Sequence, residues 1–126
     1  MGERILVDTD ILIDYYRNRL DLPPGNLYYI SLITLYEYIR GTKSPAKAKK
    51  LLEESFSVIP LTNKILEEAA SIWRDLKASG LMLDDRDLII GTTAIVYGLK
   101  LYTRNLKHFE RLEKYGLTFY TPKNLT

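Results

Sequence analysis

The stretch RILVDTDILI at residues 4–13 decides the fold class. It opens with one charged residue and three apolar ones, the pattern of a strand that is buried on both faces of a parallel sheet. Thr9 and the acids that follow this run are residues that cap helices, so we expect a helix over residues 11–17. A buried strand that passes directly into a helix predicts an α/β unit.

The same alternation continues along the chain. Further helices are expected from Ser31 or Thr34 to Gly41 and at residues 45–54, 63–79, 87–97 and 109–115, with extended segments at 28–33, 56–61, 100–103 and 117–120. Strands that alternate with helices predict an α/β fold with a central, mostly parallel sheet of about five strands and helices on both faces. The chain has 126 residues, the usual size of one domain, so we expect a single domain over 1–126.

Composition excludes several classes of function. Apolar residues make up 46% of the chain and charged residues 27%, values typical of a folded globular protein. There is no cysteine and only one histidine, His108, so a metal would have to bind oxygen ligands. The sequence has no apolar run of about 18 residues and no signal-peptide pattern, which predicts a cytoplasmic protein without a membrane span.

Acidic residues recur where the expected strands end. Asp8 follows the first strand, Glu37 lies one turn into the helix after the second, and Asp87 heads an apolar helix with Asp85 close before it. Asp8 and Asp87 have an alternative role as helix N-caps, whereas Glu37 lies among apolar residues and needs a partner if buried. Ligands of open parallel sheets bind at the carboxyl ends of the strands, where these acids can meet. Three adjacent carboxylates would repel one another unless a cation such as Mg²⁺ joined them.

Four segments resemble, in order and spacing, the four sequence blocks of PIN domains, and most closely those of VapC-type toxins. They are VDTDILIDYY at 7–16, ISLITLYEYIRG at 30–41, DRDLIIGTTAIVYG at 85–98 and LYTRNLKHFERL at 101–112. The resemblance spans nearly the whole chain. It implies a single PIN-like domain and a ribonuclease, dependent on Mg²⁺ or Mn²⁺, that hydrolyses RNA phosphodiester bonds with a metal-activated water.

The resemblance also assigns roles to individual residues. Asp8, Glu37 and Asp87 match the acids that bind metal and support catalysis, and Asp85 is a further metal candidate. Supporting roles fall to Thr9, Thr103 and Asn105, of which the last two match a Thr-x-Asn pair.

Two residues depart from the family pattern. His108 stands where PIN domains often have an acid, and we favour a structural or substrate-contact role for it over metal ligation. Asp10 stands where Asn or Ser is frequent; it either caps the first helix, which we favour, or adds charge to the site.

Basic residues gather in two stretches, residues 39–50 and 98–126. Taken singly, each stretch is more simply explained as a solvated helix face. Together they suit a polyanion, and four residues near the site blocks are candidates for holding the RNA backbone: Arg40, Lys43, Arg104 and Lys107. The resemblance further implies a small VapB-type antitoxin as partner and a homodimer.

Two other functions fit parts of the sequence. DTDIL is similar to the Asp-x-Asp opening of haloacid-dehalogenase-like phosphatases, with Asp8 as nucleophile and Asp10 as acid/base, but this leaves Glu37 without a role. Alternatively, the same fold serves as a non-catalytic scaffold that binds RNA or protein. The three acids favour the nuclease.

Overall fold

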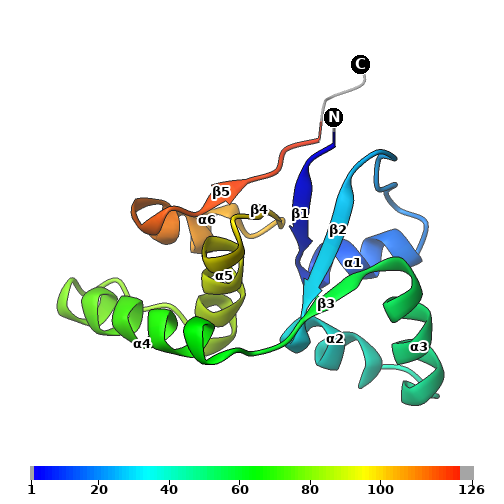
Figure 1. Ribbon diagram of the computed structural model, residues 1–126, viewed down its shortest axis with the longest axis horizontal. Coiled ribbons are helices and arrows are strands. Elements are labelled where there is room, and N and C mark those ends of the chain that lie inside the picture. Colours follow the sequence, from blue (N-terminus) through cyan, green and yellow to red (C-terminus); the bar gives the residue numbers. More distant parts are fainter. Residues whose placement is uncertain (1, 123–126) are drawn as a thin grey trace.

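A computed structural model describes residues 2–122, so Lys123 of the second basic stretch lies outside it. Five strands form one sheet in the order β3-β2-β1-β4-β5, and every neighbouring pair is parallel (Figure 1). The strands are β1 (Arg4–Val7), β2 (Leu27–Ser31), β3 (Ser57–Ile59), β4 (Lys100–Tyr102) and β5 (Thr118–Phe119). The predicted α/β fold with a parallel sheet is confirmed.

Helices cover both faces of the sheet. They are α1 (Thr9–Tyr16), α2 (Leu32–Ile39), α3 (Pro45–Ser55), α4 (Asn63–Ala78), α5 (Asp85–Tyr97) and α6 (Leu106–Phe109), the last continued by a 3₁₀ helix, η1 (Glu110–Tyr115). Successive side chains of β1 point to opposite faces. Ile5 and Val7 join the core formed with α1, α2 and α3, while Leu6 joins the core formed with α4, α5 and η1. Within residues 2–122, no helix combines the length and the apolar character needed to cross a membrane.

Several predicted boundaries differ from the observed ones by a few residues, and two of these differences have a clear local cause. Helix α5 begins at Asp85 rather than Asp87, because the carboxylate of Asp84 accepts a hydrogen bond from the backbone N–H of Asp87 at 2.9 Å and caps the helix. The capping role considered for Asp87 therefore belongs to Asp84. In the fourth block, the helix expected at 109–115 is instead the short α6 followed by η1, which ends at Gly116 in a left-handed conformation, φ 103°.

The topology explains why the acids meet. The chain runs outward from β1 through β2 to β3, and α4 and α5 then return it to β4 on the other side of β1 (Figure 1). The carboxyl ends of β1 and β4 are thus neighbours at the point where the strand order reverses, the usual place for a ligand crevice. Asp8 directly follows β1 and Thr103 directly follows β4.

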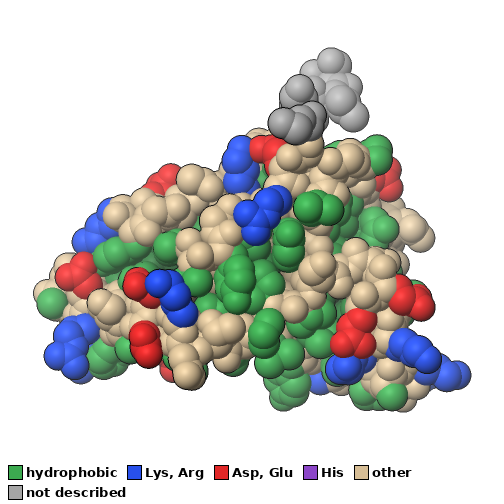
Figure 2. Space-filling view, in the orientation of Figure 1, with side chains coloured by type: hydrophobic (Ala, Val, Ile, Leu, Met, Phe, Trp, Pro, Cys, Tyr) green, Lys and Arg blue, Asp and Glu red, His purple; other side chains and the backbone are tan. Residues whose placement is uncertain are grey.

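The surface is uneven in character. On the face shown in Figure 2, hydrophobic side chains gather in a central band, while lysine, arginine and acidic side chains lie mainly toward the two ends. Exposed apolar area of this kind often marks a contact surface in a folded protein.

Candidate active site

The structure brings Asp8, Glu37 and Asp87 together around one side chain, Arg86. The Arg86 guanidinium donates from Nη2 to Asp8 Oδ1 at 2.8 Å and from Nη1 to Asp87 Oδ1 at 2.5 Å. Its Nε donates to both carboxylate oxygens of Glu37, at 2.8 and 3.0 Å. One acid that follows β1, one on α2 and one at the start of α5 therefore share one cation.

Asp8 is the most buried of the three acids, with 1% of its surface exposed. Its Oδ1 accepts the backbone N–H of Thr9 at 2.7 Å, so Asp8 is also the N-cap of α1. Its Oδ2 accepts the hydroxyl of Thr103 at 2.8 Å, and that hydroxyl in turn accepts the backbone N–H of Asn105 at 3.0 Å. The Asp8 carboxylate is thus fixed in orientation by contacts on both oxygens.

Glu37 lies on α2, and its carboxylate contacts the side chain of Thr9. The Thr9 hydroxyl donates to Glu37 Oε1 at 2.6 Å and accepts from Arg86 Nη2 at 3.0 Å. Burial acts to raise the pKa of Glu37, but the hydrogen bonds from Arg86 and Thr9 outweigh it and lower that pKa below its ordinary value. Glu37 therefore carries its negative charge at neutral pH.

Asp87 occupies the first turn of α5 and is only 4% exposed. Burial raises the pKa of its carboxyl, the nearby Asp84 acts in the same direction, and the hydrogen bond from Arg86 opposes them. His108, which is 59% exposed, lies with Nδ1 3.5 Å from Asp87 Oδ2. His108 thus borders the cluster without filling the place of a fourth acid.

Arg86 was missed by the sequence reasoning. Burial alone would lower its pKa, but the contacts with Glu37, Asp8 and Asp87 raise that pKa instead, so the side chain stays charged. One signal was present: a single arginine stands between acids in DDRD, directly before an apolar helix. Spacing alone does not tell which way such a side chain points.

The donor set suits a hard divalent cation, because three carboxylates from separate elements converge on a cationic group. In this structure the cation among the carboxylates is the Arg86 guanidinium. Among residues 2–122, no three Asp, Glu or His side chains are already grouped closely enough to hold a metal ion. Arg86 lies between the three carboxylates and contacts each of them.

The other predicted residues lie around this cluster. Asp85 is exposed at the first position of α5 and borders an apolar hollow with Trp73, apart from the cluster. Asp10 lies in the first turn of α1 and accepts backbone N–H groups from Ile11 and Arg104, but the N-cap of that helix is Asp8, so the favoured capping role of Asp10 was wrong. Asn105 donates a hydrogen bond from its backbone N–H to the Thr103 hydroxyl. The four basic candidates, Arg40, Lys43, Arg104 and Lys107, are all exposed.

Two hollows flank the acids. One, of about 230 Å³, is lined by Glu37 together with Ile13, Tyr16, Arg17, Tyr38, Gly41 and Thr42. The other, of about 150 Å³, is lined by Asp87 together with Met82, Leu83, Asp84, His108 and Arg111. An extended ligand that crosses the acids can therefore find space on either side.

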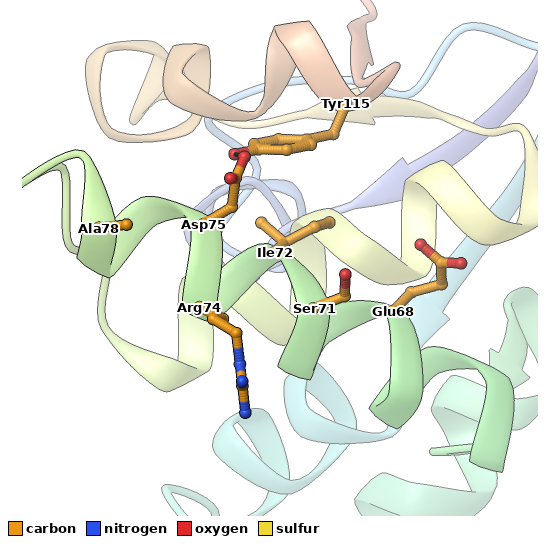
Figure 3. Close-up of a pocket in the computed structure, with 7 residues that line it drawn as sticks. All are labelled: Glu68, Ser71, Ile72, Arg74, Asp75, Ala78 and Tyr115. Carbon is orange, nitrogen blue, oxygen red and sulfur yellow. Dashed lines mark hydrogen bonds between the residues drawn. The ribbon is translucent and has the colours of Figure 1, made fainter.

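A larger hollow of about 400 Å³ lies elsewhere, along α4 and beneath η1 (Figure 3). There the Tyr115 hydroxyl points at Asp75 and donates to its Oδ2 at 2.5 Å, while Arg74 and Glu68 point away from this pair. None of the residues predicted for the site lines this hollow. Size alone does not identify the functional site.

Known proteins are similar to this chain over most of its length. The family model for the PIN domain matches residues 5–115. Ribonuclease VapC1 of Methanocaldococcus jannaschii is 41% identical over 120 residues, which cover 93% of this chain and 87% of that protein. Ribonuclease VapC10 of Mycobacterium tuberculosis is 31% identical over 131 residues, 94% of this chain and 95% of that protein.

A solved structure is also similar. The structure of VapBC-1 from nontypeable Haemophilus influenzae superposes with a TM-score of 0.77 at 26% identity, covering 93% of this chain and 96% of that chain. These likenesses disfavour the phosphatase alternative, which rested on a single short motif. By its family model, its relatives and its fold, the chain belongs to the PIN domain family.

Proposed function

We propose that this protein is a divalent-metal-dependent endoribonuclease and the toxin of a VapBC-type toxin–antitoxin pair. The observation that carries the proposal is the convergence of Asp8, Glu37 and Asp87 on a single cation at the switch point of the sheet. The relatives named ribonuclease VapC support the same activity. Mg²⁺ or Mn²⁺ is the proposed cofactor, because carboxylate oxygens are the ligands that these ions prefer.

Each acid has a defined task in this proposal. Asp8, Glu37 and Asp87 would hold the ion, which would supply a water of lowered pKa and neutralise charge on the phosphate. Thr103 and Thr9 keep the Asp8 and Glu37 carboxylates in fixed orientations by hydrogen bonds at 2.8 and 2.6 Å. No side chain of this chain is needed as a nucleophile. Asp85 stays a weaker candidate for ligation, since it lies exposed and apart from the cluster.

Basic residues near the acids supply contacts for the RNA backbone. Arg104 and Lys107 follow β4 at the same edge of the sheet as Asp8, and Arg40 and Lys43 follow α2, which carries Glu37. All four are exposed, and lysine and arginine in such positions bind phosphates largely independently of sequence. We propose that a single strand of RNA crosses the acids between the two flanking hollows.

Partners follow from the relatives. VapBC-1 and a toxin–antitoxin complex from Klebsiella pneumoniae are among the similar structures, and we propose a small VapB-type antitoxin for this chain too. Self-association as a homodimer stays a prediction; the hydrophobic band in Figure 2 supports it, and light scattering after gel filtration tests it. An RNA substrate makes the cytoplasm the proposed location.

The test is cleavage of a mixed pool of structured and single-stranded RNAs by protein freed of any antitoxin. Each reaction is run with Mg²⁺, with Mn²⁺ and with EDTA. We expect cleavage that needs the metal and that falls by at least about a hundredfold in Asp8→Asn, since one carboxylate ligand is lost. The matched control is Asp75→Asn, the same chemical change on α4 beside the hollow in Figure 3, which should cleave like the wild type.

Other outcomes would contradict the proposal in different ways. Equal cleavage by the wild type and Asp8→Asn would mean a misplaced site or a contaminating nuclease. Equal inactivity on every RNA, with the fold intact by circular dichroism, would favour the non-catalytic scaffold. Turnover of p-nitrophenyl phosphate would revive the phosphatase alternative.

A further inference from the structure

We propose that Arg86 is a built-in competitor for the divalent cation: its guanidinium occupies the position between the three carboxylates and must leave before an ion can bind. The inference rests on the proposed function and adds a form of control to it. Arg86 thereby sets the metal concentration at which the site is occupied.

Contacts with the acids are the first argument. Five hydrogen bonds of 3.0 Å or less join the guanidinium to Asp8, Glu37, Asp87 and Thr9. Each acid commits at least one oxygen to Arg86, and a metal ion needs these same oxygens as ligands. The two cations therefore exclude each other.

The position of Arg86 in α5 is the second argument. It lies in the first turn of the helix, where the positive end of the helix dipole disfavours a cation, and its neighbours Asp84, Asp85 and Asp87 are acids of the kind that suit this place. The local structure of α5 thus gives no reason for an arginine here. Its contacts with Asp8 and Glu37, 78 and 49 residues away in sequence, give the reason.

A route out of the site is the third argument. The Arg86 side chain is 29% exposed, while those of Asp8 and Asp87 are almost fully buried. A flexible side chain with one solvent-facing edge can swing outward without unfolding α5, whereas the buried carboxylates stay in place. The carboxylate oxygens that Arg86 releases are then free to accept an ion instead.

Calorimetry with Mn²⁺ alone tests the competition, using full-length Arg86→Gln and, as a matched control, Arg74→Gln. Arg74 is an exposed arginine on α4 that points away from the Tyr115–Asp75 pair (Figure 3). We expect Arg86→Gln to bind Mn²⁺ at least about tenfold more tightly than the wild type, because a unit positive charge has left the site. Arg74→Gln should stay within about twofold of the wild type. Equal or weaker binding by Arg86→Gln would overturn the proposal.

A measurement on the wild type covers the case in which Arg86→Gln fails to fold. In an NMR spectrum of arginine side-chain N–H groups recorded in EDTA, the Arg86 Nε–H should exchange slowly with solvent, because it is hydrogen-bonded to Glu37. Saturating Mg²⁺ should abolish that protection. A protected signal that persists at saturation overturns the inference.

Failure of this inference can be told from failure of the proposed function. Metal-dependent RNA cleavage with no tightening of Mn²⁺ binding in Arg86→Gln refutes the competition alone. Absence of both Mn²⁺ binding and cleavage, in the wild type and in Arg86→Gln, refutes the metal-dependent nuclease as well.

Discussion

Replacing Thr103 by valine should destabilise the protein through one buried hydrogen bond. The Thr103 hydroxyl donates to Asp8 Oδ2 at 2.8 Å, and both residues are buried. A hydrogen bond to a charged partner contributes about 1.5–3 kcal/mol, and its loss leaves a carboxylate oxygen without a donor. The Asn105 N–H also loses its acceptor, at a partly exposed position where water can replace it. We expect the free energy of unfolding to fall by about 2–4 kcal/mol, and Tm by roughly 10 °C.

The matched control is Thr103→Ser, which keeps the hydroxyl and removes one methyl group. Loss of a single buried methyl costs about 1 kcal/mol, so Thr103→Ser should lie clearly between the wild type and Thr103→Val. Urea unfolding in EDTA, followed by circular dichroism, measures all three proteins under the same conditions.

A double-mutant cycle then assigns the loss to the bond with Asp8. If that bond carries the effect, Thr103→Val should cost about 1–3 kcal/mol less in an Asp8→Ala background than in the wild type. Additive effects, or equal stability of Thr103→Val and Thr103→Ser, would refute the reasoning.

Three further predictions concern packing, pH and RNA binding. Gly91→Ala should lower the free energy of unfolding by about 1–3 kcal/mol, because the added Cβ would lie 2.3 Å from Leu112 Cδ1. In the control Gly41→Ala, the added Cβ has no atom nearer than 3.7 Å, so its free energy of unfolding should be close to that of the wild type. Urea unfolding measures both. Burial raises the pKa of Asp10 in the folded state, and a neighbouring carboxylate raises it further. The protonated Asp10 side chain therefore favours folding at low pH, and this stabilisation is lost as pH rises through the folded pKa. Asp10→Asn should therefore gain Tm relative to the wild type at neutral pH and lose that advantage near pH 4; a pH-independent difference would contradict this. Lys43→Gln should weaken binding of single-stranded RNA in fluorescence anisotropy and reduce the slope of log K against log salt by about 0.7, and an unchanged slope would remove Lys43 from the interface.

The positions of the acids could be predicted because the topology of the sheet largely determines them. The run RILV has to be a buried strand, and all neighbouring strands of this sheet are parallel, so residues that follow strands gather at one edge. Asp8 and Thr103 meet for this reason, although 95 residues separate them. The start of α5 was misplaced because DDRD offers several acids as caps, and only the backbone conformation shows that Asp84 takes that role.

Arg86 could not be predicted from the same rules, and the reason is physical. Periodicity reports which residues face a core, and Arg86 faces neither core; a charged residue at the start of a helix is by default solvated. Its placement depends on a balance between burying a guanidinium and leaving three carboxylates without a counter-charge, and that balance involves residues from three separate blocks. If metal is the stronger competitor, the same three blocks hold the ion and Arg86 returns to solvent. Under the proposed competition, the acids set the position of the site, and the metal concentration decides which cation lies among them.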